Sequence, residues 1–280
     1  MTFSIVAVDP DAREVGVATQ SKFLAVGAVV PWARGDIGAV ATQSFADATF
    51  GPRGLDLLAT GVGPQETLDR LLASDQDREQ RQVGAVDAAG HAASFTGSGC
   101  FAHASSLAGD GFACQGNILA SEAVVPAMAE SFEGTVGRPL ADRLIEALRA
   151  AQSEGGDRRG QESAALLVAK PGGGYGGNND RYIDLRVDHH DRPIEELANL
   201  LLWHRLYFER PAEEELIPAD AAVEEEMRAM LGRLGKIESG QDLWAAMQVY
   251  MGWENLEERW VGPGRLDPKV LDYLRQQAGS

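Results

Sequence analysis

The second residue, Thr2, has the chemistry of a nucleophile for an amide carbonyl. Removal of Met1 would make Thr2 the first residue, and its hydroxyl could then attack a carbonyl while its own α-amine takes the proton. An α-amine has a pKa of about 7.7–8.0, so it accepts a proton near neutral pH without a specialised environment. The alternative is that Thr2 simply begins a strand, since small residues are common at position two.

The run Gln115-Gly116-Asn117 could hold the oxyanion that such an attack creates. An asparagine side chain and a backbone N–H are suitable donors, and loss of one donor typically costs about 10²–10³ in rate. We therefore assign this role to Asn117 and the Gly116 amide, with Gln115 as a substrate contact. The alternative is a turn, in which glycine supplies a positive φ and asparagine bonds to the backbone.

Ser21, Lys22 and Arg34 are further candidates near predicted strand ends. If the first two strands form a hairpin, Ser21 and Lys22 return beside Thr2. Ser21 could then polarise the nucleophile and Lys22 could contact the substrate. Arg34 is the other cation near the start of a strand, and we assign it to substrate binding as well. A solvated surface charge is the alternative for both cations.

The polar run that begins Asp157-Arg158-Arg159 precedes a predicted strand. Two arginines in an acidic protein could bind an anionic partner, because guanidinium groups form strong charge-assisted hydrogen bonds. Asp157 and Arg158 are therefore candidate substrate contacts. The alternative is an ion pair with Asp157 or with the acidic surface.

The remaining motifs do not predict a metal or cofactor site. The glycine-rich residues 172–177 are not followed by Gly-Lys-Ser/Thr, as a phosphate-binding loop would be. His189 and His190 are adjacent, so in a strand they point to opposite faces. Cys114 lies in an apolar run, where cysteine usually packs as a small hydrophobic residue. We expect no cofactor and no metal.

Composition excludes several classes of partner. The chain has 42 acidic and 25 basic residues and a net charge of -17, which repels phosphate backbones and anionic lipids. It has no apolar run of membrane-spanning length, and its start lacks the features of a secretory signal. We expect a cytoplasmic protein with reduced thiols that binds neither nucleic acid nor membranes.

Strands and helices are predicted in blocks rather than in alternation. Strands are expected at residues 3–8, 15–19, 24–30, 37–42, 83–87, 92–96, 112–115, 164–169 and 182–187. Helices are expected on either side of residues 61–64 and at 122–132, 140–152 and 193–208. This order disfavours a single parallel sheet and favours an α+β fold, a four-layer αββα sandwich of two sheets faced by helix pairs.

We expect two domains, the αββα domain at residues 1–210 and a small helical domain at 211–280. The second region contains no strand-like run and begins with an acidic stretch. Trp244, Trp253 and Trp260 all lie in it. We expect its helices to pack around Trp244 and Trp253.

Several runs in the chain carry a family resemblance. They are residues 2–7, 26–34, 38–43, 50–54, 115–117, 155–161 and 173–177. These runs resemble a bacterial family of uncharacterised proteins assigned to the N-terminal-nucleophile (Ntn) hydrolase superfamily. Residues 211–280 resemble a small domain described as peptidoglycan-binding. The resemblance implies the αββα fold and, for the tail, peptidoglycan fragments as a partner.

We therefore predict an Ntn-type amidohydrolase that cleaves the C–N bond of a small amide or peptide-like substrate. Thr2 is the nucleophile, Ser21 assists it, and Gly116 and Asn117 hold the oxyanion. The alternative is a non-catalytic scaffold or binding protein of the same fold, for cell-wall fragments or small amides. We also expect the chain to form a homo-oligomer.

Overall fold

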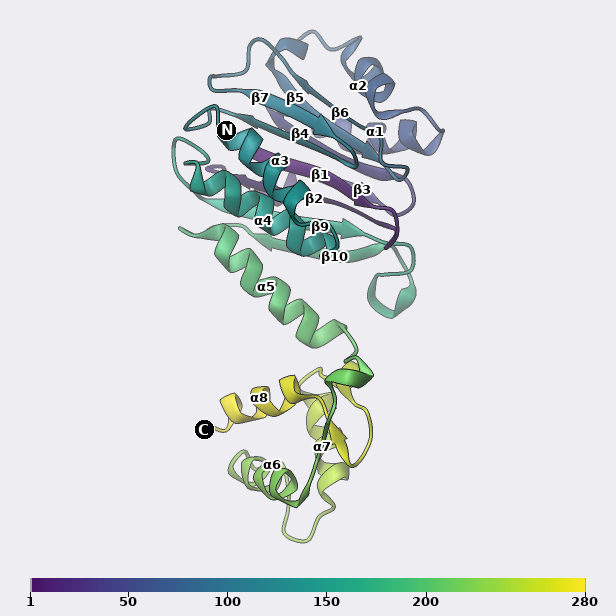
Figure 1. Ribbon diagram of the computed structural model, residues 1–280, viewed down its shortest axis with the longest axis vertical. Coiled ribbons are helices and arrows are strands. Elements are labelled where there is room, and N and C mark those ends of the chain that lie inside the picture. Colours follow the sequence, from purple (N-terminus) through teal and green to yellow (C-terminus); the bar gives the residue numbers. More distant parts are fainter. Residues whose placement is uncertain (1, 280) are drawn as a thin grey trace. The chain divides into compact units, whose positions relative to one another are not determined.

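The computed structural model describes residues 2–279, which form two compact units divided between residues 200 and 201 (Figure 1). Helix α5 (Pro193–Phe208) continues across this division. Its residues Trp203, Leu206 and Tyr207 pack against the core of the C-terminal unit. The division therefore lies before residue 210, where the composition changes, because the end of this helix supplies part of the second core.

A six-stranded antiparallel sheet runs through the N-terminal unit in the order β10-β9-β2-β1-β8-β7. The hairpin expected at the start of the chain is confirmed, with Phe3 paired with Gln20. The edge strand β7 was not predicted, because Ser-Ser-Leu-Ala-Gly lacks the β-branched and aromatic residues typical of strands. The strands are β1 (Thr2–Asp9), β2 (Glu14–Ser21), β7 (Ser105–Gly109), β8 (Phe112–Asn117), β9 (Ser163–Ala169) and β10 (Arg181–Val187).

A second antiparallel sheet has the order β3-β4-β5-β6. Its strands are β3 (Pro31–Arg34), β4 (Gly38–Ser44), β5 (Arg81–Asp87) and β6 (Ala92–Thr96). The strand expected at residues 24–30 is wrong. Ala25 has a φ of 53° and leads into the 3-10 turn η1 (Val26–Ala28), which a strand cannot accommodate. The strand begins only at Pro31, where an edge strand tolerates proline as its first residue.

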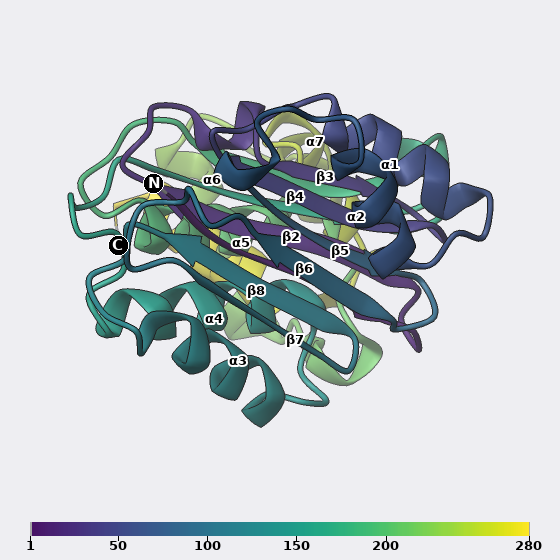
Figure 2. The ribbon, with the colours of Figure 1, turned by 90° about the horizontal axis from the view of Figure 1, so that it is seen from above.

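Helix pairs cover the outer faces of both sheets, as Figure 2 shows. Helices α1 (Phe50–Ala59) and α2 (Pro64–Leu72) pack on β4, β5 and β6. Helices α3 (Val124–Gly134) and α4 (Leu140–Ser153) pack on β8, β1 and β2. The N-terminal unit is therefore a mixed α/β structure built on antiparallel sheets.

The layer between the two sheets is apolar at one end and polar at the other. Val6, Val17 and Ala41 belong to one buried cluster that joins the sheets. Because side chains alternate along a strand, Thr2 and Ser4 lie on the same face of β1 as Val6. The Ser4 hydroxyl accordingly donates to Gln43 Oε1 across the two sheets, at 2.6 Å. Thr2 therefore lies at the polar end of the layer.

The C-terminal unit is helical, as expected, with one short strand pair that the sequence did not predict. Aspartates cap its helices, as Asp220 does by accepting from the amides of Ala222 and Val223. None of the helices in residues 2–279 combines the length and apolar character that a membrane span requires. The elements are α6 (Ala221–Arg233), α7 (Leu243–Trp253), α8 (Pro268–Gln277), β11 (Ile217–Pro218), β12 (Arg265–Leu266) and the 3-10 turns η4 (Glu213–Glu215) and η5 (Glu257–Arg259).

The expectation that Trp253 lies in this core is wrong. Trp253 is 74% exposed, and Lys236 Nζ lies 4.7 Å from its ring centre. Trp244 is partly buried against the core, whose centre is made of methionine, leucine and tyrosine side chains such as Met247 and Tyr250. Helix α7 is apolar on nearly every side, so its sequence does not indicate which face is buried.

We expect a fragment ending at residue 210 to keep the fold of the N-terminal unit. The apolar clusters between its sheets and beneath α1 and α2 contain no residue beyond Ala169. Circular dichroism of the fragment should show mixed α/β structure and a cooperative thermal transition. A fragment without that transition would mean that residues 211–280 complete the core of the N-terminal unit.

Candidate functional site

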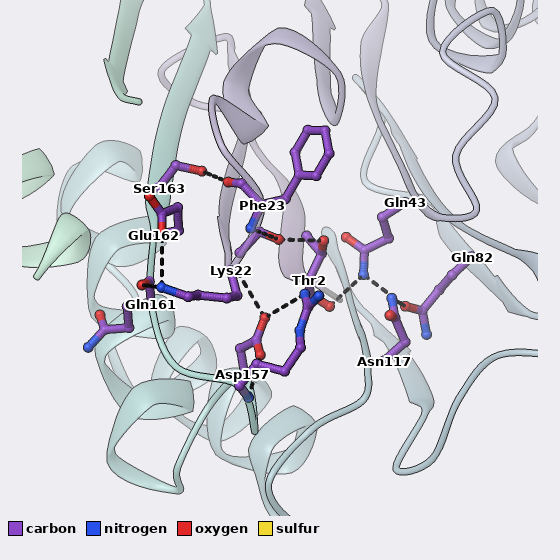
Figure 3. Close-up of polar contacts among 12 residues, drawn as sticks. Thr2, Lys22, Phe23, Gln43, Gln82, Asn117, Asp157, Gln161, Glu162 and Ser163 are labelled. Atoms are coloured by element: carbon purple, nitrogen blue, oxygen red, sulfur yellow. Dashed lines mark hydrogen bonds and ion pairs between the residues drawn. The ribbon is translucent and has the colours of Figure 1, made fainter. Parts of the chain in front are cut away.

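Thr2 lies at the start of β1 with its hydroxyl directed at a second hydroxyl (Figure 3). Its Oγ1 donates to Ser21 Oγ at 3.1 Å, and Ser21 Oγ also accepts from the Phe23 amide at 3.0 Å. Thr2 is 5% exposed and Ser21 is fully buried. The hairpin therefore brings the end of β2 beside Thr2. The α-amine of Thr2 becomes free only when Met1 is removed, and Met1 lies outside the described residues.

Asn117 is the residue directly opposite Thr2 on the neighbouring strand β8. It is buried, and its Nδ2 donates to Gln82 Oε1 at 2.8 Å. A carboxamide has two N–H donors, so one donor of Asn117 is used by this bond and the other can serve an oxygen placed beside Thr2. The structure thus brings together Thr2, Ser21 and Asn117.

Two glutamines that the sequence did not single out support this site from the second sheet. Gln43 Nε2 donates to Gln82 Oε1 at 2.8 Å and lies 3.2 Å from Thr2 O (Figure 3). Both glutamines are buried. The alternation of side chains along β4 could have indicated this position for Gln43. Gln43 lies on the same face of the strand as Ala41, which is buried between the sheets. The two side chains link Thr2 to Asn117 and fix their relative position.

Gln115 and Gly116 are too buried for the substrate contact and the oxyanion donation expected of them. The Gln115 side chain is fully buried, donates to Ser4 Oγ at 2.6 Å and accepts from Ser94 Oγ at 3.1 Å. Gln115 therefore joins the two sheets instead of facing a substrate. Gly116 has a pairing partner on each side, Phe3 and Ser105, so the sheet uses its backbone groups. This arrangement favours the Asn117 side chain over the Gly116 amide as a donor.

Lys22 and Asp157 hold the loop that follows β2. The Asp157 carboxylate is buried and accepts from the Lys22 amide at 2.9 Å, which anchors the chain directly after Ser21. The Lys22 ammonium donates to Glu162 Oε2 at 2.7 Å. This bond, followed by a contact with His189, lowers the pKa of Glu162. Lys22 and Asp157 therefore position the site rather than offer a free charge to a substrate.

The two arginines selected from the sequence lie in different places. Arg158 is exposed, and its amide donates to Ile118 O at 3.2 Å, just after Asn117. Arg34 pairs with Gly38 at the opposite end of β4 from Gln43, about 16 Å away along the strand. Its guanidinium binds Asp56 at 3.1 Å. The structure therefore does not bring Arg34 to Thr2, because Arg34 lies beside the first residue of β4 and Thr2 lies near its last residues.

Cys114 and the adjacent histidines lie in surroundings that do not favour nucleophilic attack or metal binding. Cys114 is fully buried, and desolvation raises the pKa of its thiol, so it does not form a reactive thiolate at neutral pH. His189 Nδ1 contacts Glu162 Oε1. Among residues 2–279, no group of three or more histidine, cysteine or carboxylate side chains could hold a metal ion.

Comparisons with known proteins divide the chain as the structure does. Residues 207–274 match a domain family described as "Putative peptidoglycan binding domain". No match was found among curated proteins. A crystal structure of a Silicibacter pomeroyi protein, described as a DUF1028 protein, is 33% identical over 73% of this chain and 86% of its own, with a TM-score of 0.66. Residues 2–197 match the model of a "Family of unknown function (DUF1028)", and the chain therefore belongs to that family.

Proposed function

We propose that this chain is an Ntn-type amidohydrolase with Thr2 as its nucleophile, and that its N-terminal unit is an αββα sandwich of that superfamily. The observation that carries the proposal is the hydrogen bond from Thr2 Oγ1 to Ser21 Oγ, at 3.1 Å, at the polar end of the layer between the sheets. The helix pairs on both outer faces support the proposed fold. Asn117 opposite Thr2 supports the proposed chemistry.

The proposed reaction begins with removal of Met1. Thr2 Oγ1 attacks the substrate carbonyl carbon and its proton passes to the α-amine of Thr2, while the carbonyl oxygen becomes an oxyanion facing Asn117 Nδ2. The C–N bond then breaks, and the leaving amine takes the proton from the α-amine. A water molecule hydrolyses the resulting ester, which restores the Thr2 hydroxyl and releases the carboxylic acid.

A β-lactone tests this proposal without knowledge of the substrate. The strained ring acylates an activated hydroxyl, so protein without Met1 should gain the mass of one lactone. Peptide mapping should place that mass on Thr2, and protein that retains Met1 should remain unlabelled. Labelling of Ser21, or equal labelling with and without Met1, would contradict the N-terminal mechanism.

Asn117→Ala should lower the rate of hydrolysis or labelling by about 10²–10³, as loss of one oxyanion donor does elsewhere. The fold should survive, because Gln82 Oε1 keeps its bond from Gln43 Nε2. Gln115→Ala is the matched control, since it cuts the buried network without touching the proposed oxyanion site. Equal kinetic loss in the two variants would assign Asn117 a structural role only.

We further propose that the C-terminal unit binds peptidoglycan fragments. The family match at residues 207–274 supports this, as does a cavity of about 500 Å³ lined by residues of α5, η5 and α8. Trp203 and Tyr273 provide aromatic surface in that lining. Its charged groups have both signs, since Asp272 also lines the cavity and Lys269 pairs with Glu215 at 3.3 Å. Such a lining suits the apolar face and the hydroxyl groups of a sugar.

Sedimentation of the full chain with isolated peptidoglycan tests this second proposal. Leu202 lines the cavity and is exposed, so Leu202→Glu should reduce co-sedimentation without disturbing the fold. Val249→Glu is the matched control, because Val249 is similarly exposed in the same unit but lies outside the cavity lining. Equal binding by the two variants would remove the cavity from the proposed site.

A further inference from the structure

Three phenylalanine side chains of the N-terminal unit are exposed to solvent. Phe23 is 56% exposed, Phe45 is 63% exposed and Phe101 is 72% exposed. We call these three side chains the phenylalanine rim. Exposed aromatic groups that gather at one place on a soluble protein commonly mark a binding surface.

All three rings belong to residues that adjoin the candidate site. The Phe23 amide donates to the same Ser21 oxygen that accepts from Thr2. Phe45 follows Gln43, which bonds to Thr2 O, by two residues and so by about 7 Å at most between Cα atoms. Phe23 and Phe45 therefore follow the ends of two different strands, each of which contacts Thr2.

Phe101 adjoins the end of a third strand, β8. Its carbonyl accepts from the Ile118 amide at 2.9 Å, and Ile118 directly follows Asn117. Asn117 in turn pairs with Thr2. Phe23 follows the end of β2, and Phe45 follows the end of β4. Phe101 bonds to the residue that follows the end of β8. All three strand ends lie next to Thr2.

We propose that the phenylalanine rim binds an apolar group of the amide substrate, attached near the scissile carbonyl. This inference rests on the proposed function, because it takes Thr2 as the point of attack. The rim residues follow or adjoin the strand ends that meet Thr2, so an aromatic or aliphatic group beside the carbonyl would lose contact with water against their rings. The Lys22 ammonium is occupied by Glu162, so it favours no acidic substituent there.

The size of the rim argues for a substrate group rather than a second copy of the chain. A phenylalanine buries on the order of 150–200 Å², so three rings of which about three fifths is exposed offer roughly 300–400 Å². A stable protein interface needs about 800 Å² from each partner. A small apolar substituent matches the available area, whereas a subunit interface would require much more of the surface.

The test compares two β-lactones that differ in one substituent, a methyl group in one and a phenethyl group in the other. Labelling of Thr2 is followed by intact mass in protein without Met1. The phenethyl lactone should react about tenfold faster, a modest effect for an apolar contact on an open surface. Changing all three rim residues to serine should bring the ratio of the two rates close to one.

Two further variants separate contact from general disturbance. The triple change to leucine should restore most of the preference, because leucine keeps an apolar surface. Val136→Ser should leave the ratio unchanged, since Val136 is exposed in the same unit but follows α3, away from the strand ends that meet Thr2.

The possible failures are distinguishable. Equal labelling by both lactones would overturn the rim assignment and leave the Thr2 mechanism standing. Absence of labelling by either lactone would overturn the proposed function and the inference with it. A serine variant that keeps the preference but changes its oligomeric state in size-exclusion chromatography would assign the rim to a subunit contact and overturn substrate binding.

Discussion

Thr2→Ala protein lacking Met1 should lose amide hydrolysis and lactone labelling by about 10³-fold or more, since removal of a nucleophile eliminates the covalent step. No other hydroxyl can replace it from the same position, because Ser21 lies at the end of the neighbouring strand without a free α-amine. The measurement is the rate of β-lactone acylation together with hydrolysis of any amide that the wild type cleaves.

The same substitution should leave the fold almost unchanged. It removes one hydrogen bond, worth about 1 kcal/mol. Ser21 Oγ keeps its bond from the Phe23 amide. In a unit of this size the melting temperature should fall by about 2–4 °C. A much larger fall would mean that loss of activity reports unfolding and not loss of the nucleophile.

Two companion variants identify the mechanism. Thr2→Ser should retain part of the activity, because a hydroxyl and an α-amine remain at the same position. Protein that retains Met1 should be as inactive as Thr2→Ala, because the α-amine then belongs to another residue. Full activity in Met1-retaining protein would exclude Thr2 as an N-terminal nucleophile and favour a binding role for the N-terminal unit.

Local pairing explains which parts of the candidate site could be predicted. The expected hairpin placed Ser21 beside Thr2, because the two strands are joined by a short turn and their register follows from it. Asn117 was selected for its chemistry, and its place opposite Thr2 depends on pairing between strands distant in sequence. Short-range pairing was thus sufficient to place Ser21 beside Thr2, whereas Asn117 was selected by its chemistry alone.

Contacts between sheets explain most of what could not be predicted. Gln43 and Gln82 meet only when the two sheets pack with a particular offset, which no local pattern specifies. Arg34 was misplaced for the related reason that β3 pairs with the far end of β4. In both cases the position of the residue depends on long-range strand register, which residue type does not indicate.

Backbone conformation accounts for the mistaken strand at residues 24–30. Its apolar residues are typical of a strand, but Ala25 adopts a left-handed conformation. Gly27 packs so closely that a Cβ there would lie 2.7 Å from the Ala165 Cβ. The turn therefore depends on contact with β9, which lies far away in the sequence.

Arg259 in the C-terminal unit is the residue whose loss should cost the most stability. It is 2% exposed, and its Nε donates to Leu206 O at 2.6 Å, at the end of α5. Its Nη1 contacts the buried Asp267 carboxylate. Asp267 caps α8 by accepting from the Lys269 amide at 2.8 Å. One side chain therefore connects the end of α5 to the start of α8, although nothing in the sequence near Arg259 indicates burial.

Arg259→Ala should destabilise the C-terminal unit by about 3–5 kcal/mol, because it leaves the Asp267 carboxylate buried without its cation. For a unit of this size the melting temperature should fall by about 12 °C or more. Tryptophan fluorescence reports this unit well, since four of the five tryptophans belong to it and only Trp32 lies elsewhere.

The matched control is Arg275→Ala, which removes an ion pair with Glu226 in the same unit. Both side chains of that pair are well exposed, so its loss should cost less than about 1 kcal/mol. The double variant Arg259→Met, Asp267→Leu should recover part of the stability, because it removes both buried charges together. Equal destabilisation by Arg259→Ala and Arg275→Ala would show that Asp267 reaches water when Arg259 is absent, and that the contacts of Arg259 with the end of α5 contribute little.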